Sequence, residues 1–76
     1  MTLKDWVEDF SDNLIELMQE KHITQHELAK VSGISVGSIN AYIHKQSQPG
    51  IKAIINLAYA LDVEINDLVD FGDMID

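Results

Sequence analysis

The sequence predicts an all-α fold, a compact bundle of five short helices around one core. Apolar residues recur at steps of three and four along most of the chain, and helix-capping residues and glycines separate these stretches. No run alternates with a period of two between hairpin signals, so no strand is expected. The 76 residues suffice for one domain, and 46% of them are hydrophobic, too many for a disordered acidic chain. We therefore expect a single domain over residues 1–76.

The first helix is expected over residues 3–21. Apolar residues recur there at helical spacing, which places them on one face of an amphipathic helix. Because charged residues interrupt this segment throughout, we expect neither a signal peptide nor a membrane span. The apolar residues of this face are Leu3, Trp6, Val7, Phe10, Leu14, Leu17 and Met18.

A second, shorter helix is expected to begin after Thr24. Thr24 and Glu27 have the spacing of a capping box, in which the threonine hydroxyl accepts a hydrogen bond from the Glu27 amide and the glutamate reaches back to the threonine amide. The helix should end near Ser32, because Gly33 follows and glycine most readily takes a positive φ after a helix.

A third helix is expected from about Val36 to Lys45, with Ser35 as its N-cap. The segment 46–50, QSQPG, then has the composition of a loop. Two further apolar segments complete the bundle, and the last one is expected to end at Gly72. Their apolar positions are Ile51, Ile54, Ile55, Leu57, Ala58 and Leu61 in the fourth helix, and Val63, Ile65, Leu68, Val69 and Phe71 in the fifth.

The formal net charge of −8 is unevenly distributed along the chain. Residues 1–20 carry six acidic side chains and one lysine, and residues 62–76 carry six acidic side chains and no basic one. Residues 21–52 carry four lysines against Glu27 alone, a local charge of +3. A charge of −8 should repel nucleic acid, but the basic middle weakens this objection. Ordinary solvated faces are the other explanation of the same distribution.

The basic middle also contains two helices joined by a glycine turn, in the sequence TQHELAKVSGISVGSIN from Thr24 to Asn40. Ala29 is small where the helices must cross, and Gly33 makes the turn. This stretch resembles the helix-turn-helix of the Cro and phage-repressor family, also called the XRE family. The resemblance covers about residues 12–71 and implies a lambda-repressor-like DNA-binding domain, with the motif at about 24–45 and an acidic C-terminal tail at 72–76. The second helix of the motif would then enter the major groove of double-stranded DNA.

The resemblance also implies which residues contact DNA. Gln25 matches the family's phosphate-contacting glutamine, and the groove-facing positions fall on the first turns of the third helix. The end of that helix would meet the DNA backbone again, where Lys45 would make binding salt-dependent. The predicted DNA-binding residues are Gln25, Ser35, Val36, Gly37, Ser38, Asn40, Ala41, His44 and Lys45.

Two departures from the family pattern favour a protein partner. Valine, glycine and alanine at the groove positions cannot make bidentate hydrogen bonds to a base edge. The first helix has Ile15 and Met18 where the family commonly has arginines, and an apolar side chain there suits a protein better than a phosphate. The C-terminal apolar residues offer a dimer surface. The predicted partner and dimer surfaces comprise Ile15, Met18, Val69, Phe71, Met74 and Ile75.

Two functions therefore remain open. The first is a small sequence-specific transcriptional regulator, a phage- or prophage-type repressor that binds a double-stranded DNA operator as a homodimer. The second is a protein-interaction module of the same fold, an antirepressor or switch modulator that binds a partner repressor in place of DNA. Its acidic ends would compete for the basic face of that partner.

We expect no enzyme, no cofactor and no metal site. The chain has no cysteine, which fits a reducing, cytoplasmic setting without disulfides. His22 and His26 have a metal-ligand spacing, but Thr24 caps a new helix between them and breaks their shared face. No phosphate-binding glycine loop and no nucleophile with a paired base is found in the sequence.

Overall fold

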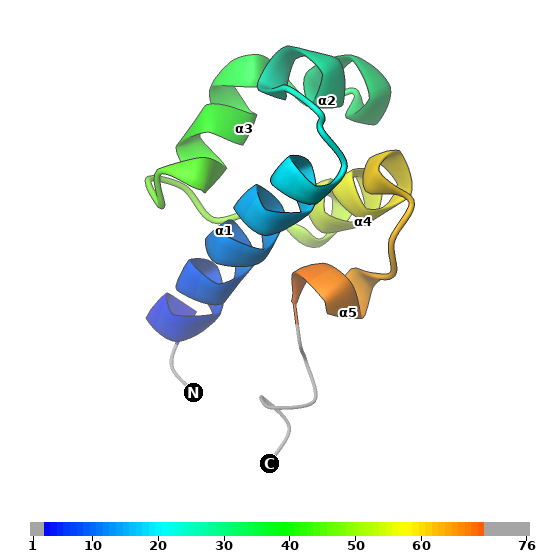
Figure 1. The fold of residues 1–76 in the computed structure, drawn as a ribbon. Helices are drawn as coiled ribbons and strands as arrows, with labels where there is room; N and C mark the ends of the chain where they lie inside the picture. Colours follow the sequence, from blue (N-terminus) through cyan, green and yellow to red (C-terminus); the bar gives the residue numbers. More distant parts are fainter. Residues whose placement is uncertain (1–2, 70–76) are drawn as a thin grey trace.

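A computed structural model describes residues 3–69, which form five helices and no strand (Figure 1). The predicted all-α, five-helix fold is thereby confirmed for this part of the chain. The helices are α1 (Leu3–Glu20), α2 (Gln25–Ser32), α3 (Val36–Ile43), α4 (Ile51–Leu61) and α5 (Ile65–Leu68).

The long helix α1 holds the bundle together. It packs against both α3 and α5, while α2 packs against α3 and α4, and α4 packs against α5. Figure 1 shows α1 running diagonally between α3 on one side and α4 and α5 on the other. The amphipathic face predicted for α1 explains this position, because Phe10, Leu14 and Met18 are buried on it. The other buried apolar residues of the core are Leu28, Ile39, Tyr42, Ile54, Leu57, Ala58, Leu61, Leu68 and Val69.

The prediction that Val69 lies on an exposed surface is wrong. Val69 is only 2% exposed and belongs to the core. Helix α5 ends at Leu68, and Val69 continues in extended backbone with φ −136° and ψ 121°. A small domain can bury only a limited share of its surface, so its core also includes the side chain of Val69, directly after the last helix. The predicted surface residues Phe71, Met74 and Ile75 and the predicted helix end at Gly72 lie outside the described residues.

Helix α3 ends at Ile43, two residues before the predicted end at Lys45. Lys45 has a φ of +60°, the left-handed conformation that stops a helix. The Lys45 amide donates to the Tyr42 carbonyl at 3.2 Å, and the Gln46 amide donates back to Ala41 at 2.8 Å. These two bonds satisfy carbonyl groups that the helix end would otherwise leave without donors.

Two other helices end in the same way, also without glycine. His22 after α1 and Asp62 after α4 have φ values of +55° and +56°. In each case the amide of the following residue donates five residues back, from Ile23 to Met18 and from Val63 to Ala58, both at 3.0 Å. Residues other than glycine pay a steric penalty in this conformation because Cβ approaches the carbonyl oxygen.

The caps predicted at the helix starts are confirmed. The Thr24 hydroxyl accepts from the Glu27 amide at 3.1 Å, and the Thr24 amide donates to Glu27 Oε1 at 3.0 Å. The Ser35 hydroxyl accepts from the Ser38 amide at 3.1 Å and so caps α3. Because the Thr24 amide, and then the Thr24 side chain, stabilise the charged carboxylate, the pKa of Glu27 lies below its ordinary value of 4.5.

We expect Asp62→Gly to stabilise the fold by about 1 kcal/mol. Glycine removes the left-handed strain at φ +56°, and the change also removes a negative charge from the negative end of the α4 dipole. Asp62→Ala is the matched control, since it removes the charge and keeps the strain. Urea unfolding followed by circular dichroism measures both variants. A glycine variant no more stable than the alanine variant would show that the backbone at this position is unstrained.

We expect Glu27 to make stability depend on acid pH. A carboxyl whose folded pKa is lowered contributes its full stabilisation above its ordinary pKa of 4.5 and loses it as the pH falls through the lowered value. The difference in unfolding free energy between the wild type and Glu27→Gln should therefore be constant near neutral pH and shrink in acid. Glu16→Gln on α1 removes the same charge without touching a cap, and serves as the control. A difference that persists unchanged through acid pH would contradict this role of the capping box.

Candidate nucleic-acid interface

The turn between α2 and α3 is built from three short contacts. Gly33 takes a φ of +76°, and its amide donates to the Ala29 carbonyl at 2.9 Å. The Ser32 hydroxyl, buried at the end of α2, accepts from the Ile34 amide at 3.1 Å. Ser35 then caps α3 as described above. The turn therefore ends one helix and starts the next within three residues, which is the geometry of a helix-turn-helix.

Four of the predicted DNA-binding residues share the outer face of α3. Gly37, Asn40, Ala41 and His44 follow one another at the i, i+3, i+4 and i+7 spacing of a single helix face. The first, second and fourth are exposed, while Ala41 is half-buried. The opposite face carries Ile39 and Tyr42 into the core.

The other two predicted DNA-binding residues within α3 lie at the edges of this face. They are Val36 and Ser38, and both are half-buried. The Ser35 hydroxyl donates to the Ser38 hydroxyl at 2.9 Å while it also accepts from the Ser38 amide. These two serines therefore use much of their hydrogen-bonding capacity on the helix cap.

A hydrogen bond joins two of the predicted DNA-binding residues, Gln25 and Asn40. The Asn40 side-chain amide of α3 donates to Gln25 Oε1 at the start of α2, with a distance of 3.3 Å. The Gln25 amide nitrogen is left to donate to another acceptor. Asn40 also receives a second contact, because His44 Nδ1 donates to its backbone carbonyl at 2.9 Å. Gln25, Asn40 and His44 thus form one connected polar group at the surface.

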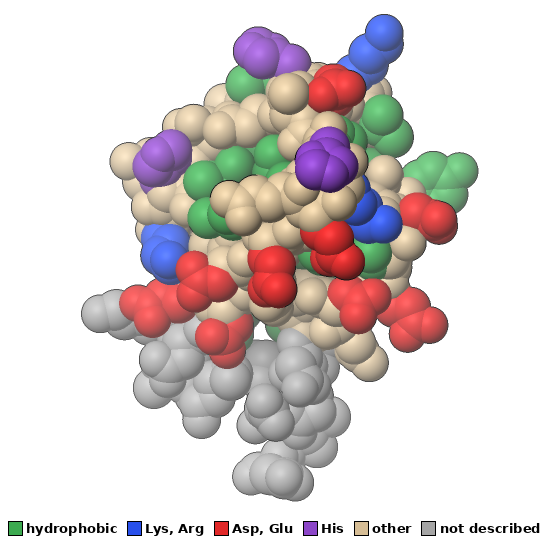
Figure 2. Space-filling model, viewed as in Figure 1, with side chains coloured by type: hydrophobic (Ala, Val, Ile, Leu, Met, Phe, Trp, Pro, Cys, Tyr) green, Lys and Arg blue, Asp and Glu red, His purple; other side chains and the backbone are tan. Residues whose placement is uncertain are grey.

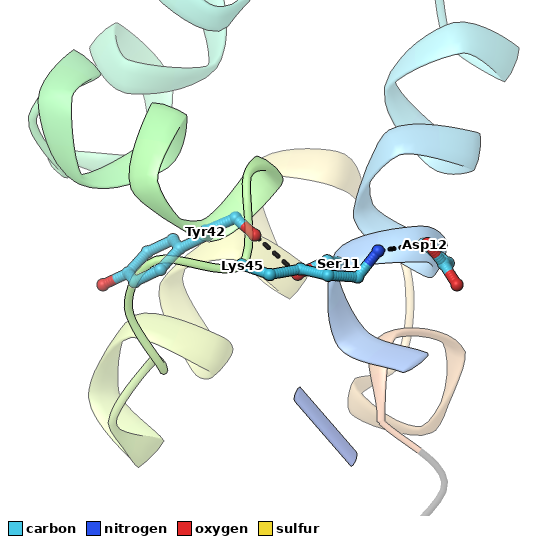
Figure 3. Close-up of polar contacts among 4 residues, drawn as sticks. All are labelled: Ser11, Asp12, Tyr42 and Lys45. Atoms are coloured by element: carbon cyan, nitrogen blue, oxygen red, sulfur yellow. Dashed lines mark hydrogen bonds and ion pairs between the residues drawn. The ribbon is translucent and has the colours of Figure 1, made fainter. Parts of the chain in front are cut away.

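Lys45 lies beside α1 and is not free of a partner. Its Nζ lies 3.1 Å from Asp12 Oδ1, and the two side chains are 40% and 66% exposed (Figure 3). Because the pair is open to water, it adds at most about 1 kcal/mol to stability. It also neutralises one of the four lysines that make the middle of the chain basic.

Three consecutive residues of α1 hold the last turn of α3, and we call them the α1 clamp: Phe10, Ser11 and Asp12. The Phe10 ring meets the Tyr42 ring edge-on, with centroids 5.8 Å apart and planes at 80°. The fully buried Ser11 hydroxyl donates to the Tyr42 carbonyl, and Asp12 pairs with Lys45 (Figure 3). The clamp therefore ties the end of α3 to α1.

Ser11 is not among the residues that the sequence predicts for this site. The signal was present, since Ser11 lies three residues before Leu14 and seven before Met18, on the apolar face of α1. A polar residue at a core position needs a buried partner. What the sequence does not reveal is which carbonyl group 31 residues away supplies it.

An apolar groove lies next to the candidate interface. It has a volume of about 570 Å³, and its apolar wall is made by Ile15, Met18, Ile23 and Ile43. Gln25 also lines it. Figure 2 shows hydrophobic side chains in the middle of this face, with histidines around them and acidic side chains gathered in the lower half. The groove thus contains two predicted partner residues, Ile15 and Met18, although Met18 is only 8% exposed.

The two histidines with metal-ligand spacing lie on different elements. His22 is in the connection after α1, and His26 is on α2, and both are exposed. Among residues 3–69, no group of three or more histidine, cysteine, aspartate or glutamate side chains is placed to hold a metal ion. No helix in this range is long and apolar enough to cross a membrane.

Known proteins resemble this chain in sequence and in fold. A helix-turn-helix family model matches residues 14–68. An uncharacterized HTH-type transcriptional regulator of Bacillus subtilis, YqaE, is 33% identical over 60 residues, which are 79% of this chain and 52% of the relative. The chain therefore spans about half the length of that relative. The crystal structure of the restriction-modification controller protein C.AhdI from Aeromonas hydrophila superposes with a TM-score of 0.78 at 31% identity, covering 82% of this chain and 94% of C.AhdI.

We expect Ser11→Ala to destabilise the fold by about 1 kcal/mol, because the Tyr42 carbonyl loses its side-chain donor and keeps only the bond from the Lys45 amide. The loss should be largest at the end of α3, where amide hydrogen exchange of Gln46 and its neighbours should accelerate. Ser47→Ala, an exposed position in the next loop, is the control and should change the stability little. If hydrogen exchange at the end of α3 were unchanged in Ser11→Ala, the clamp would not position this helix.

Proposed function

We propose that this chain, which belongs to the helix-turn-helix family of the Cro and phage-repressor type, is a small sequence-specific DNA-binding transcriptional regulator of the phage- or prophage-repressor kind. Helix α3 would enter the major groove of a double-stranded operator. The observation that carries the proposal is the Gln25–Asn40 hydrogen bond. Gln25 suits contact with a phosphate, and Asn40 suits contact with a base edge. The hydrogen bond holds the two side chains together, so both contacts would be made in one orientation of the domain on DNA.

The outer face of α3 suits close approach more than dense hydrogen bonding. Gly37 and Ala41 are small, which lets the helix backbone come near the bases. Asn40 is the residue of this face that can bond bidentately to adenine, and Ala41 and Val36 suit the methyl group of thymine. His44 and Lys45 at the end of the helix suit the backbone. Ser35 and Ser38 add less, since they bond each other.

Charge makes the proposed complex salt-sensitive and favours a homodimer. The basic segment is small, and its Lys45 is paired with Asp12, so one copy gains few phosphate contacts. A two-fold pair would place two α3 helices about 34 Å apart in successive major grooves and add their contacts. The proposal assigns the chain no catalytic step.

A second candidate function rests on the apolar groove. Its wall of Ile15, Met18 and Ile43 offers a surface to an apolar side chain of a partner repressor, which would make the chain an antirepressor or switch modulator. Because Gln25 also lines the groove, such a partner would cover the phosphate contact. The same DNA-binding measurement separates the two candidates.

We expect opposite effects on DNA affinity from the two residues of the exposed ion pair. Lys45→Ala should weaken binding to every sequence and reduce the slope of log K against log salt by about one. Asp12→Asn should strengthen binding, because it frees Lys45 from its partner and removes a charge that repels phosphate. Fluorescence anisotropy titrations with duplex DNA from 50 to about 200 mM salt measure both effects.

The double variant is the control for this pair. Asp12→Asn should no longer strengthen binding once Lys45 is alanine, beyond the general effect of one lost negative charge. Glu16→Gln, one turn further along α1, reports that general effect. No binding to any operator or promoter duplex at low salt would overturn the DNA-binding proposal and favour the partner-binding candidate.

A further inference from the structure

A line of carboxylates runs along α1 beside the apolar groove. Asp12, Glu16 and Glu20 are exposed and follow one another at steps of four, so they share one side of the helix. We call them the α1 acidic row. Ile15, which forms part of the groove wall, lies three residues after Asp12 and directly before Glu16, so the row and the groove adjoin each other. Figure 2 shows the same arrangement, with hydrophobic side chains in the middle of the face and acidic side chains below them.

Most of the negative charge of the α1 acidic row is not neutralised within residues 6–69. In this range Asp12 pairs with Lys45, whereas neither Glu16 nor Glu20 makes an ion pair. The Asp12 side chain is 66% exposed, and an exposed pair of this kind is weak enough for another cation to compete for the carboxylate. The row therefore presents carboxylates at intervals of about 6 Å along one edge of the groove.

The shape of the apolar groove suits one face of a helix better than a small molecule. Ile15, Ile23 and Ile43 in its wall are only half-buried, so they leave apolar surface in contact with water. The groove is open to solvent on one side, whereas pockets for small molecules enclose about 70–90% of the ligand surface. An amphipathic helix needs to bury only one face, because its apolar side chains at positions i, i+3, i+4 and i+7 project together.

Charge decides which kind of helix fits the groove. A helix that lies along α1 in the groove would run beside the α1 acidic row, so lysine or arginine residues on its flank would face the carboxylates. Basic residues spaced by four on the partner helix match the spacing of the row. A second copy of this chain is disfavoured as the occupant, because it carries a net charge of −8. An acidic helix would be repelled for the same reason.

We propose that the apolar groove binds a basic amphipathic helix of a partner protein. The apolar face of this helix fills the groove, and its lysine or arginine side chains pair with the α1 acidic row. The proposal rests on the second candidate function and specifies the chemistry of its partner. Because a helix is about 10 Å wide and Gln25 lines the groove, the bound helix also covers the residue predicted to contact a phosphate. Binding of this partner and binding of DNA then exclude each other.

Titration of the full chain with three synthetic peptides tests the proposal. The first peptide has about 14 residues, with leucine at the i, i+3, i+4 and i+7 positions of a helix and lysine elsewhere. The second has glutamate in place of lysine, and the third has alanine in place of leucine. Fluorescence anisotropy of the labelled peptides measures the dissociation constants. The leucine–lysine peptide should bind at least about 10-fold more tightly than either of the others, because it alone matches both the groove and the acidic row.

Two matched pairs of variants locate the bound peptide. Ile15→Ser removes part of the groove wall and should weaken binding of the leucine–lysine peptide by about 10-fold. Ile55→Ser makes the same change on α4, where Ile55 is 47% exposed, and should leave the affinity unchanged. Glu16→Gln should weaken binding by about 2- to 5-fold, and this loss should shrink as the salt concentration rises. Asn66→Lys makes the same change in net charge at an exposed position of α5 and should have a smaller effect.

Two further measurements keep each outcome decisive. Circular dichroism checks that the variants fold. In the wild type, the leucine–lysine peptide should shift the backbone amide resonances of Ile15 and Ile43 and the side-chain amide resonance of Gln25, which needs no variant. Equal affinities for the three peptides, an unchanged affinity in Ile15→Ser, or resonance shifts confined to α4 would each overturn the proposal.

Titration with duplex DNA in the absence of any peptide keeps this proposal separate from DNA binding. A chain that binds duplex DNA at low salt but not the leucine–lysine peptide would overturn the groove proposal and leave the DNA-binding proposal standing. A chain that binds the peptide in the groove but no duplex DNA would support the groove proposal and overturn DNA binding. A chain that binds each of them supports both proposals.

Discussion

The end of α3 is tied to α1 by one buried hydrogen bond, from the Ser11 hydroxyl to the Tyr42 carbonyl. The last carbonyl groups of any helix lack partners within the helix. Here the Tyr42 carbonyl accepts from the Lys45 amide at 3.2 Å, and α1 supplies a second, buried donor. The neighbouring contacts of the α1 clamp act on the same turn, since Phe10 packs on Tyr42 and Asp12 pairs with Lys45. A second side chain of α1 does the same for α5, because Asn13 donates to the Leu68 carbonyl at 2.8 Å. The longest helix therefore fixes the ends of two others.

The contact that helps to hold α3 also limits what α3 can bind. Asp12 places a carboxylate beside the lysine that best suits a phosphate. Asp12 belongs to the acidic first helix and Lys45 to the basic middle of the chain, so this ion pair joins the two oppositely charged segments. The pair is exposed on both sides, so its energy is small and a polyanion can compete for the lysine. The affinity of this surface for DNA should therefore be reduced by the ion pair and should depend on the salt concentration. A net charge of −8 together with a basic middle segment leads to the same expectation.

Features set by neighbouring residues were predictable from the sequence, and features set by distant contacts were not. The capping box at Thr24, the turn at Gly33 and the cap at Ser35 depend on residues within four positions, and each prediction was confirmed. The end of α3 was misplaced because a lysine in left-handed backbone gives no sequence signal comparable to glycine. Val69 was misplaced because its burial depends on how α5 meets the rest of the core. The Gln25–Asn40 bond joins two residues that the family resemblance had assigned separately. Whether these side chains contact DNA remains a prediction of that resemblance.

Helices α3 and α4 contain no acidic residue. Ten of the thirteen acidic residues lie within residues 3–69, and if they served solubility alone, some of them would be expected on every helix. Instead, among residues 3–69, both helices present only neutral or basic side chains to solvent. Because carboxylates repel a polyanion, their absence from α3 suits the proposed contact with DNA. The one carboxylate beside this contact, that of Asp12, is paired with Lys45, so its repulsion of a phosphate is partly neutralised.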